Sequence, residues 1–372
     1  MSHRRWTPVA LALLVFGCGH TDAFETSIPV VGPSGSGPDV RLTYSSNQDY
    51  WPIWTEDGRG ILYSFIAPDA GAQHRCIGLL PAGGGAASWQ LCDNRATQGD
   101  SVNSFPAYAL GSDGRLLYVE AVAPRGAGST APAHVTLFLA DTAHPFIRRT
   151  VLTLPTFASG IPVAWLADIT WTGPATFIAL GLDYSAAAHC RSCLADDTLF
   201  PGKAVVRGTI TSNGATLTPV PGTVGATGYA FAERGASLVF TLRDDRQLYE
   251  VPLAGGMPTA VAIVSQNTSA QLLGVSCRGT TCVVAVDPVT LTTVLPSGFL
   301  YPSFGAGPTE LRGVSLSTGL VQVLRTTAGV VATPQISPLT GDVVAQVGGG
   351  FGHLQTFNSP GSDLYLYLGL VP

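Results

Sequence analysis

A short segment near the N-terminus predicts a β-hairpin, and this segment recurs along the chain. The first copy, residues 47–65, places Asp57-Gly58 between the runs 52–54 and 61–65, which are apolar and rich in aromatic residues. An Asp-Gly pair flanked by such runs is a strong hairpin signal, because the turn needs residues that tolerate positive φ. A second copy at residues 105–118 centres on Gly114, which is 56 positions after Gly58. A repeat of this spacing indicates a repeat architecture.

Weaker copies of the hairpin follow at similar intervals. Six units are centred on the turn glycines Gly58, Gly114, Gly173, Gly235, Gly279 and Gly341. After each hairpin the alternation of apolar and polar residues predicts a third strand and a fourth strand, as at 135–139 and 149–153. Four antiparallel strands in each of six units predict an all-β, six-bladed β-propeller over residues 39–372.

The two ends of the predicted ring complement one another. The sixth unit ends with the strand at 363–368 and lacks a fourth strand, whereas residues 39–44 form an extra strand before the first hairpin. Pairing this N-terminal strand with the last blade would remove an open sheet edge. A two-sheet sandwich is the alternative fold, but it gives no role to the complementary ends.

The first hairpin resembles the repeat of TolB-type six-bladed propellers, whose consensus is roughly D-x-x-P-x-W-S-P-D-G-x-x-I-x-Y/F. The matching residues are Asp49, Pro52, Trp54, Asp57-Gly58, Ile61 and Tyr63, with Thr55-Glu56 in place of Ser-Pro. The second copy keeps Pro106, Tyr108 and Ser112-Asp113-Gly114 with one extra residue, and later copies keep the turn glycine and the apolar pattern. The resemblance implies the architecture and no catalytic residues: each Asp-Gly forms a turn, and each Trp or Tyr packs between blades.

Composition excludes one class of partner. Only 12% of the residues are charged and the net charge is −5, so the basic face of a nucleic-acid-binding protein is not expected. The 44 Gly and 27 Pro residues suit short strands joined by turns. Beyond the first 20 residues, no apolar run is long enough to span a bilayer. We therefore expect a soluble mature chain that is a monomer and carries no cofactor.

The N-terminus has the pattern of an export signal. Residues 1–17 combine the basic His3-Arg4-Arg5 with an apolar core and lead to Cys18, which resembles the lipidated cysteine of bacterial lipoproteins. An ordinary secretory signal with an incidental Cys is the alternative. Residues 18–38, rich in Gly, Pro and Ser, predict a flexible tether. Gly19 at the following position favours the outer membrane by analogy with enteric lipoproteins, and the sequence leaves the periplasmic and surface faces open.

The six remaining cysteines form three locally spaced pairs. In an exported protein disulfides are the expected state, although spacing alone does not fix the connectivity. Local pairing is geometrically easiest, and it would join Cys76 with Cys92, Cys190 with Cys193, and Cys277 with Cys282. The Cys190-x-x-Cys193 spacing also occurs in redox and zinc sites, but no helix is predicted there and no fourth ligand is evident, so a structural disulfide is favoured.

The segments between second and third strands differ greatly in length, and they share one rim of a propeller. The longest are 183–203 in blade 3 and 287–308 in blade 5, and long insertions on one face of a repeat array mark its binding face. The aromatic residues Phe299, Tyr301, Phe304 and Phe351 on this rim suit contacts with a protein or glycan. Alternatively, these side chains fold back as an apolar plug over the blade.

The same rim is expected to carry four histidines: His74, His134, His189 and His353. The blades that hold them are consecutive around the ring, so a metal at the channel mouth is a second hypothesis, by analogy with polysaccharide lyases on related propellers. No His-x-His or Glu-x-x-His spacing supports it. The sequence therefore predicts a non-catalytic envelope lipoprotein that binds a protein or glycan through one rim, with a metal-dependent polysaccharide-acting enzyme as the alternative.

Overall fold

The computed structural model describes most of the chain from residue 39 onward. The described ranges are 39–43, 49–67, 74–92, 101–124, 134–154, 166–182, 203–232, 236–242, 245–287, 290–294, 300–304, 309–327, 330–348 and 362–372. Two groups of predicted features lie outside these ranges. The first is the N-terminal segment with the signal, the lipidation site and the tether, and the second is the Cys190/Cys193 pair.

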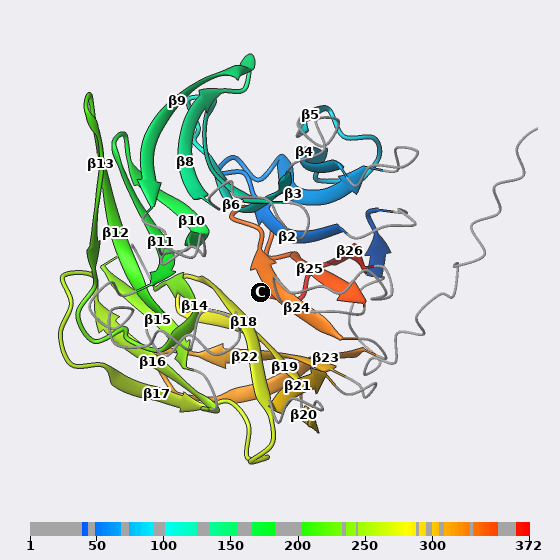
Figure 1. The fold of residues 1–372 in the computed structure, drawn as a ribbon. Helices are drawn as coiled ribbons and strands as arrows, with labels where there is room; N and C mark the ends of the chain where they lie inside the picture. The colour runs from blue at the N-terminus through cyan, green and yellow to red at the C-terminus, as the bar shows by residue number, and fades with distance from the viewer. Residues whose placement is uncertain are drawn as a thin grey trace, which may run out of the picture.

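Six four-stranded antiparallel sheets are arranged as the blades of a ring (Figure 1). Blade 1 contains β2 (Asp49–Trp54), β3 (Gly60–Ala67), β4 (His74–Pro81) and β5 (Trp89–Cys92). Blade 2 contains β6 (Ser101–Leu110), β7 (Arg115–Pro124), β8 (His134–Asp141) and β9 (His144–Leu154). Blade 3 contains β10 (Leu166–Gly173), β11 (Thr176–Leu182), β12 (Lys203–Thr211) and β13 (Gly214–Pro219).

The remaining blades complete the ring. Blade 4 contains β14 (Ala226–Phe231), β15 (Ser237–Leu242), β16 (Gln247–Pro252) and β17 (Thr259–Ile263). Blade 5 contains β18 (Gln271–Arg278), β19 (Thr281–Asp287), β22 (Thr309–Ser315) and β23 (Val321–Thr327). Blade 6 contains β24 (Val331–Ile336), β25 (Val343–Gly348), β26 (Ser362–Tyr367) and, from the other end of the chain, β1 (Asp39–Arg41). The predicted six-bladed propeller is confirmed.

The N-terminal strand closes the last blade, as the sequence predicts. β1 runs antiparallel to β26, with Val40 opposite Leu366. Two ion pairs hold it: Arg41 binds Asp363 of β26 at 2.7 Å, and Asp39 binds Arg325 of blade 5. The first and last described strands thus meet inside blade 6, and Figure 1 shows this blade beside blade 1; the junction of blades 6 and 1 is here called the seam.

Every first strand contains a β-bulge one to four residues after it begins. In blade 1 the bulge lies between Tyr50 and Ile53, and in blade 6 between Ala332 and Gln335. The motif prolines Pro52, Pro106 and Pro334 all fall inside bulges. A bulge interrupts the ladder, so it accepts a residue that has no N–H to donate. The motif proline therefore marks the bend of the first strand.

Side chains just after the bulges join neighbouring blades. The Trp54 indole N–H donates to the Gln335 carbonyl of blade 6 at 2.9 Å, and the Tyr108 hydroxyl of blade 2 donates to the Trp51 carbonyl of blade 1 at 2.5 Å. Tyr229 of blade 4 likewise donates to the Asp168 carbonyl of blade 3. Burial raises the pKa of Tyr229 far above its usual value, so this phenol stays a donor. The predicted packing of motif aromatics between blades is confirmed.

Replacing Tyr108 by phenylalanine should lower the free energy of unfolding by about 1–2 kcal/mol, because the part-buried Trp51 carbonyl loses this donor. Tyr249→Phe is the matched control, since that hydroxyl binds Asp245 within its own blade near solvent. Urea unfolding followed by fluorescence measures both variants. If both variants lost the same unfolding free energy, the hydrogen bond between blades 1 and 2 would contribute no more than one within a blade.

Turn glycines behave as predicted at most described positions. Gly58 and Gly114 have φ of 63° and 81°, and Gly279 and Gly341 are also positive. Gly173 was predicted to form a turn, and that prediction is wrong. It is the last residue of β10, paired with Thr176, and residues 174–175 form the turn because Pro174 suits a turn position. Gly235 lies outside the described residues.

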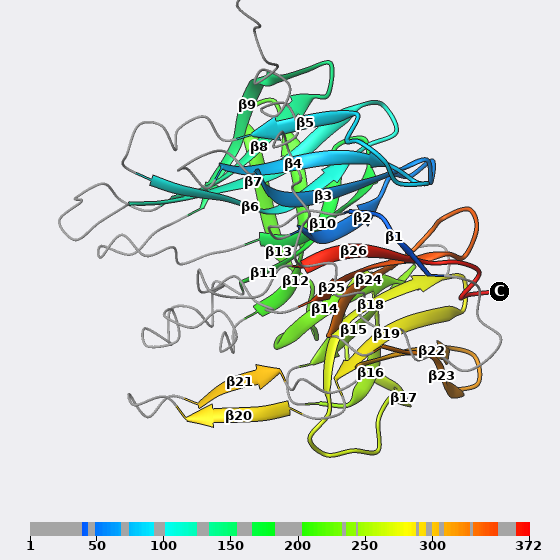
Figure 2. The same cartoon turned by 90° about the vertical axis from the view of Figure 1, so that its right-hand side faces the viewer.

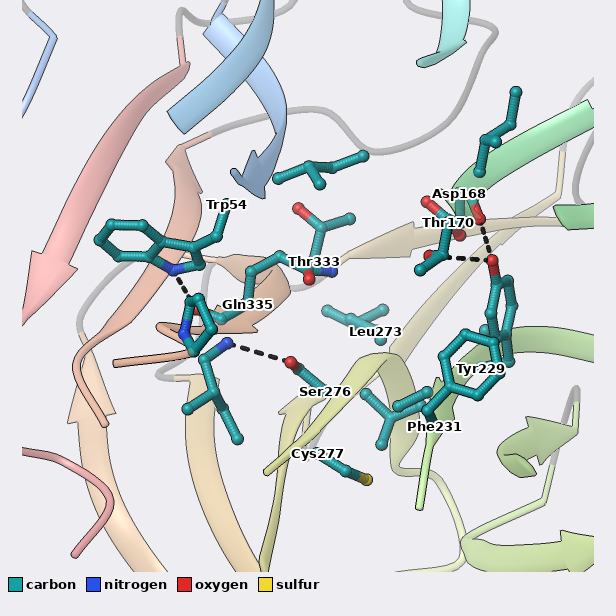
Figure 3. Close-up of a pocket in the computed structure, with 18 of the residues that line it drawn as sticks. Trp54, Asp168, Thr170, Tyr229, Phe231, Leu273, Ser276, Cys277, Thr333 and Gln335 are labelled. Carbon is teal, nitrogen blue, oxygen red and sulfur yellow. Dashed lines mark hydrogen bonds between the residues drawn. The ribbon is translucent and has the colours of Figure 1, made fainter. Parts of the chain in front are cut away.

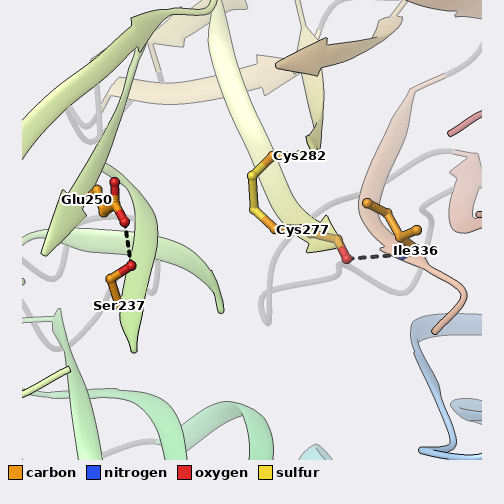
Figure 4. The surroundings of a disulfide bond; sticks show 6 residues. Ser237, Glu250, Cys277, Cys282 and Ile336 are labelled. Atoms are coloured by element: carbon orange, nitrogen blue, oxygen red, sulfur yellow. Dashed lines mark hydrogen bonds between the residues drawn. A yellow bond between two sulfur atoms is a disulfide. The ribbon is translucent and has the colours of Figure 1, made fainter. Parts of the chain in front are cut away.

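Two of the three predicted disulfides are present in the described residues. Cys76 and Cys92 lie opposite one another on β4 and β5, with Cα atoms 4.1 Å apart. Cys277 and Cys282 close the first hairpin of blade 5, as Figure 4 shows. On the chain-entropy estimate, the longer of these two loops contributes about 3 kcal/mol.

Candidate functional site

The topology separates two faces of the ring. Because all blades are antiparallel and begin at the channel, second strands end and third strands begin on one face, here called the rim. The turns between first and second strands lie on the opposite face, here called the turn face. Blade 4 connects β15 to β16 almost directly across the rim, whereas 21 residues (288–308) separate β19 from β22.

Blade 5 inserts a hairpin at the rim. β20 (Thr290–Val294) and β21 (Leu300–Phe304) pair with each other, and in the described residues neither joins a blade sheet. Figure 2 shows the pair projecting to one side of the ring. The sequence predicted an aromatic insertion at this place but not its strand structure. Tyr301 and Phe304 lie on β21, while Phe299 and Phe351 lie outside the described residues.

Two of the four candidate histidines can be placed along the backbone. His74 is the first residue of β4 and His134 the first residue of β8, so both occupy the rim as expected. His189 and His353 lie outside the described residues. Within the described ranges, no group of three or more His, Cys, Asp or Glu side chains is placed to hold a metal ion.

A cavity of about 290 Å³ lies in the central channel. Its walls come from the first strands of blades 1, 3, 4, 5 and 6 (Figure 3). The lining runs from the bulges, at Asp168 and Thr333, to the strand ends and turns, at Glu56 and Pro338. This cavity therefore belongs to the turn-face half of the channel, away from the rim hairpin.

Figure 3 shows how the side chains surround this cavity. Trp54 and Gln335 lie on one side, and Thr170, Tyr229 and Phe231 lie on the other. The Tyr229 hydroxyl is committed to blade 3, where it donates to Asp168 and lies 3.2 Å from the Thr170 hydroxyl oxygen. These contacts fix the aromatic wall in place.

Two backbone outliers occur in the cavity wall. Asp168 and Thr333 have φ of 50° and 47°, a region that residues with a Cβ rarely adopt. Both sit in bulges, and Trp51 at the corresponding bulge of blade 1 has φ of 54°. Such strained residues persist only where surrounding contacts hold them. The wall is thus rigid at the points where its polar groups face the channel.

A second cavity of about 360 Å³ adjoins the first on the turn face, between blades 1 and 2. The two share Thr55 and Glu56. Arg59 and Ser112 line only the second cavity, and the Ser112 N–H donates to the Glu56 carboxylate at 3.2 Å. The two cavities therefore lie on either side of the Thr55–Glu56 segment.

The channel cavity was not predicted from the sequence. Its residues come from five blades and are separated by up to 285 positions, between Ile53 and Pro338. A signal was nevertheless present in the repeat, because the cavity residues follow the bulge in each first strand, as Gln335 follows Pro334. Aligning the six first strands on their bulges would have collected them.

No described helix is long and apolar enough to cross a membrane. Searches against protein families and curated protein sequences found no match.

Solved structures share the architecture at very low sequence identity. A luciferin-regenerating enzyme aligns with a TM-score of 0.55 and 10% identity, covering 90% of this chain and 95% of that one. Regucalcin, a calcium-binding protein from Agrobacterium tumefaciens strain C58, aligns at 0.47 and 12% identity over 88% and 92%. The β-propeller domain of Cps50 (Swd1) from Myceliophteria thermophila aligns at 0.46 and 9% identity over 89% and 100%. The first likeness supports the propeller fold, and the fold alone.

Proposed function

We propose that the protein is a lipid-anchored binding protein of the bacterial cell envelope that presents its rim to a partner protein. Cys18 would carry the lipid, and residues 18–38 would tether a TolB-type propeller to the outer membrane. The anchor is the only membrane contact in this proposal, and the propeller acts as a monomeric, non-catalytic scaffold.

Hairpin β20–β21 is the observation that carries the proposal. A two-stranded sheet on its own is marginally stable in water, because it buries little apolar surface. In the described residues its outer edges are not paired with a blade. Backbone groups on such an edge can pair with a strand of another protein, and the apolar and aromatic residues of β21 add side-chain contacts. A protein partner is favoured over a glycan because a glycan offers no matching strand.

The rim proposal is tested by alanine substitution on β21. The full-length chain is used to capture a partner from solubilised envelopes, and the purified partner is then titrated against wild type and the double variant Tyr301→Ala/Phe304→Ala. The double variant should bind at least about tenfold more weakly, as expected for aromatic anchors. Leu320→Ala is the matched control, because Leu320 is 65% exposed on the same blade at the turn between β22 and β23.

Unchanged affinity in the double variant would show that the partner does not bind through the β20–β21 hairpin. Retention by isolated envelope polysaccharide, with no protein captured, would replace the protein partner by a glycan. The hypothesis of a metal-dependent enzyme stays a prediction that rests on the four rim histidines.

A further inference from the structure

We propose that the channel cavity on the turn face binds a neutral, hydroxyl-rich ligand of one or two sugar rings. This site is separate from the rim hairpin in residues and in face, so it goes beyond the function proposed above and stands without it.

The free hydrogen-bonding capacity of the wall points to this ligand. Gln335 has a side-chain amide with no partner among the described residues, so it offers both donors and an acceptor. The Ser276 hydroxyl oxygen accepts a hydrogen bond from the Ile336 N–H at 3.0 Å and keeps its own proton. The Tyr229 proton goes to the Asp168 carbonyl, so the Thr170 hydroxyl, 3.2 Å from the Tyr229 oxygen, donates there and offers its lone pairs as acceptors. Donors and acceptors therefore face the cavity together.

A hydroxyl group both donates and accepts, so a polyol satisfies a mixed wall of this kind. An anion would need donors and positive charge, but no Lys, Arg or His occurs among the described residues that line the cavity. An ammonium compound would use the acceptors alone and leave the Ser276 hydroxyl proton and the Gln335 amide N–H groups without partners, which is costly for a side chain as buried as Ser276. One oxygen of the Glu56 carboxylate accepts from the Ser112 N–H, and the carboxylate adds an acceptor at the edge of the cavity.

The apolar part of the wall fits the same ligand. Trp54 and Phe231 line the cavity from opposite sides, as Figure 3 shows, and aromatic rings pack against the C–H faces of sugars. A volume of about 290 Å³ is close to the lower end of small-molecule pockets. The adjoining cavity beyond Glu56 gives room for a second ring.

The cavity wall is preformed at Thr333. The Thr333 hydroxyl is buried without a partner in the described residues, and its backbone is held at positive φ. The positive φ belongs to the bulge, since Trp51 outside the cavity shares it, but the unsatisfied Thr333 hydroxyl is a cost that folding alone does not require and is typical of preformed ligand sites.

The test measures binding of named sugars to the full-length chain. Glucose, N-acetylglucosamine, maltose and lactose are titrated by saturation-transfer NMR and calorimetry, with gluconate and glucosamine as charged counterparts. Saturable binding of a neutral sugar is expected. Gln335→Leu should weaken it about tenfold, which equals about 1.4 kcal/mol. Gln322→Leu makes the same change on the exposed outer strand of blade 5 and should leave the affinity unchanged.

Thermal unfolding of each variant checks that the ring is intact, and Gln335→Glu serves as a second variant that keeps the shape but removes the donors. Three results would overturn the proposal: no saturable binding of any neutral sugar, tighter binding of gluconate or glucosamine, or the same affinity in the Gln335 and Gln322 variants. None of these results bears on partner capture by β21, so the two proposals fail separately.

Discussion

Replacing Arg325 by alanine should lower the free energy of unfolding by about 3–5 kcal/mol, because it leaves the Asp39 carboxylate buried without its partner. The side chains of Arg325 and Asp39 are 9% and 8% exposed, so water cannot replace the lost contact. Asp39 lies on the strand that closes blade 6, and Arg325 lies on β23 of blade 5. The loss should therefore appear as a loosening of β1 at the junction of blades 5 and 6.

Urea unfolding with hydrogen exchange at residues 39–43 measures the effect. Asp113→Asn is the control, since the ion pair of Asp113 with Arg115 has side chains 51% and 35% exposed and should contribute about 1 kcal/mol or less. The double variant Asp39→Leu/Arg325→Met removes both charges together and should recover most of the loss, because an apolar pair needs no desolvation of ions. A single variant as stable as wild type would show that β1 does not depend on this ion pair.

The blade pattern could be predicted because its causes are local. Alternation of apolar residues and the turn residues at Gly58 and Gly114 act within one hairpin, and they recur. The closing strand followed from counting strands at the two ends. Gly173 misled the prediction because Pro174, the next residue, offers an equally good turn.

What the sequence did not reveal depends on distant pairs. The Asp39–Arg325 contact joins residues 286 positions apart, and the channel cavity joins five blades. Only three of the six bulges have a signal in the sequence, which is the proline in the first strand. The first strands of blades 3, 4 and 5 bulge without a proline. Asp49 looked like an ordinary residue of the repeat motif, yet the ring buries it to 2% exposure.

The burial of Asp49 predicts an unusual dependence of stability on pH. Desolvation raises the pKa of this carboxyl from 3.8 to about 7, and the nearby Asp363 carboxylate adds to the rise. A hydrogen bond with Thr43 and the charge of Arg41 oppose it. One carboxylate oxygen of Asp49 has no partner in the described residues. The folded chain therefore prefers the protonated acid more strongly than the unfolded chain does.

This preference decides whether folding stability rises or falls with pH. Below pH 3.8 the acid is protonated in both states, so it costs nothing. As the pH rises from about 4 to about 7 the unfolded chain loses the proton first, so the contribution of Asp49 to folding stability falls. Above pH 7 the cost levels off, at up to about 4 kcal/mol.

Asp49→Asn should therefore raise the free energy of unfolding at pH 8, by up to about 4 kcal/mol less the value of the Thr43 contact. At pH 4 it should match wild type. Urea unfolding at several pH values gives the difference between the two proteins, in which the titration of all other groups cancels. Asp57→Asn is the control with the opposite sign, because hydrogen bonds from Thr55 and Arg59 lower the pKa of that exposed carboxyl. A difference that stays constant from pH 4 to pH 8 would show that Asp49 is not buried as an acid at the seam of the ring.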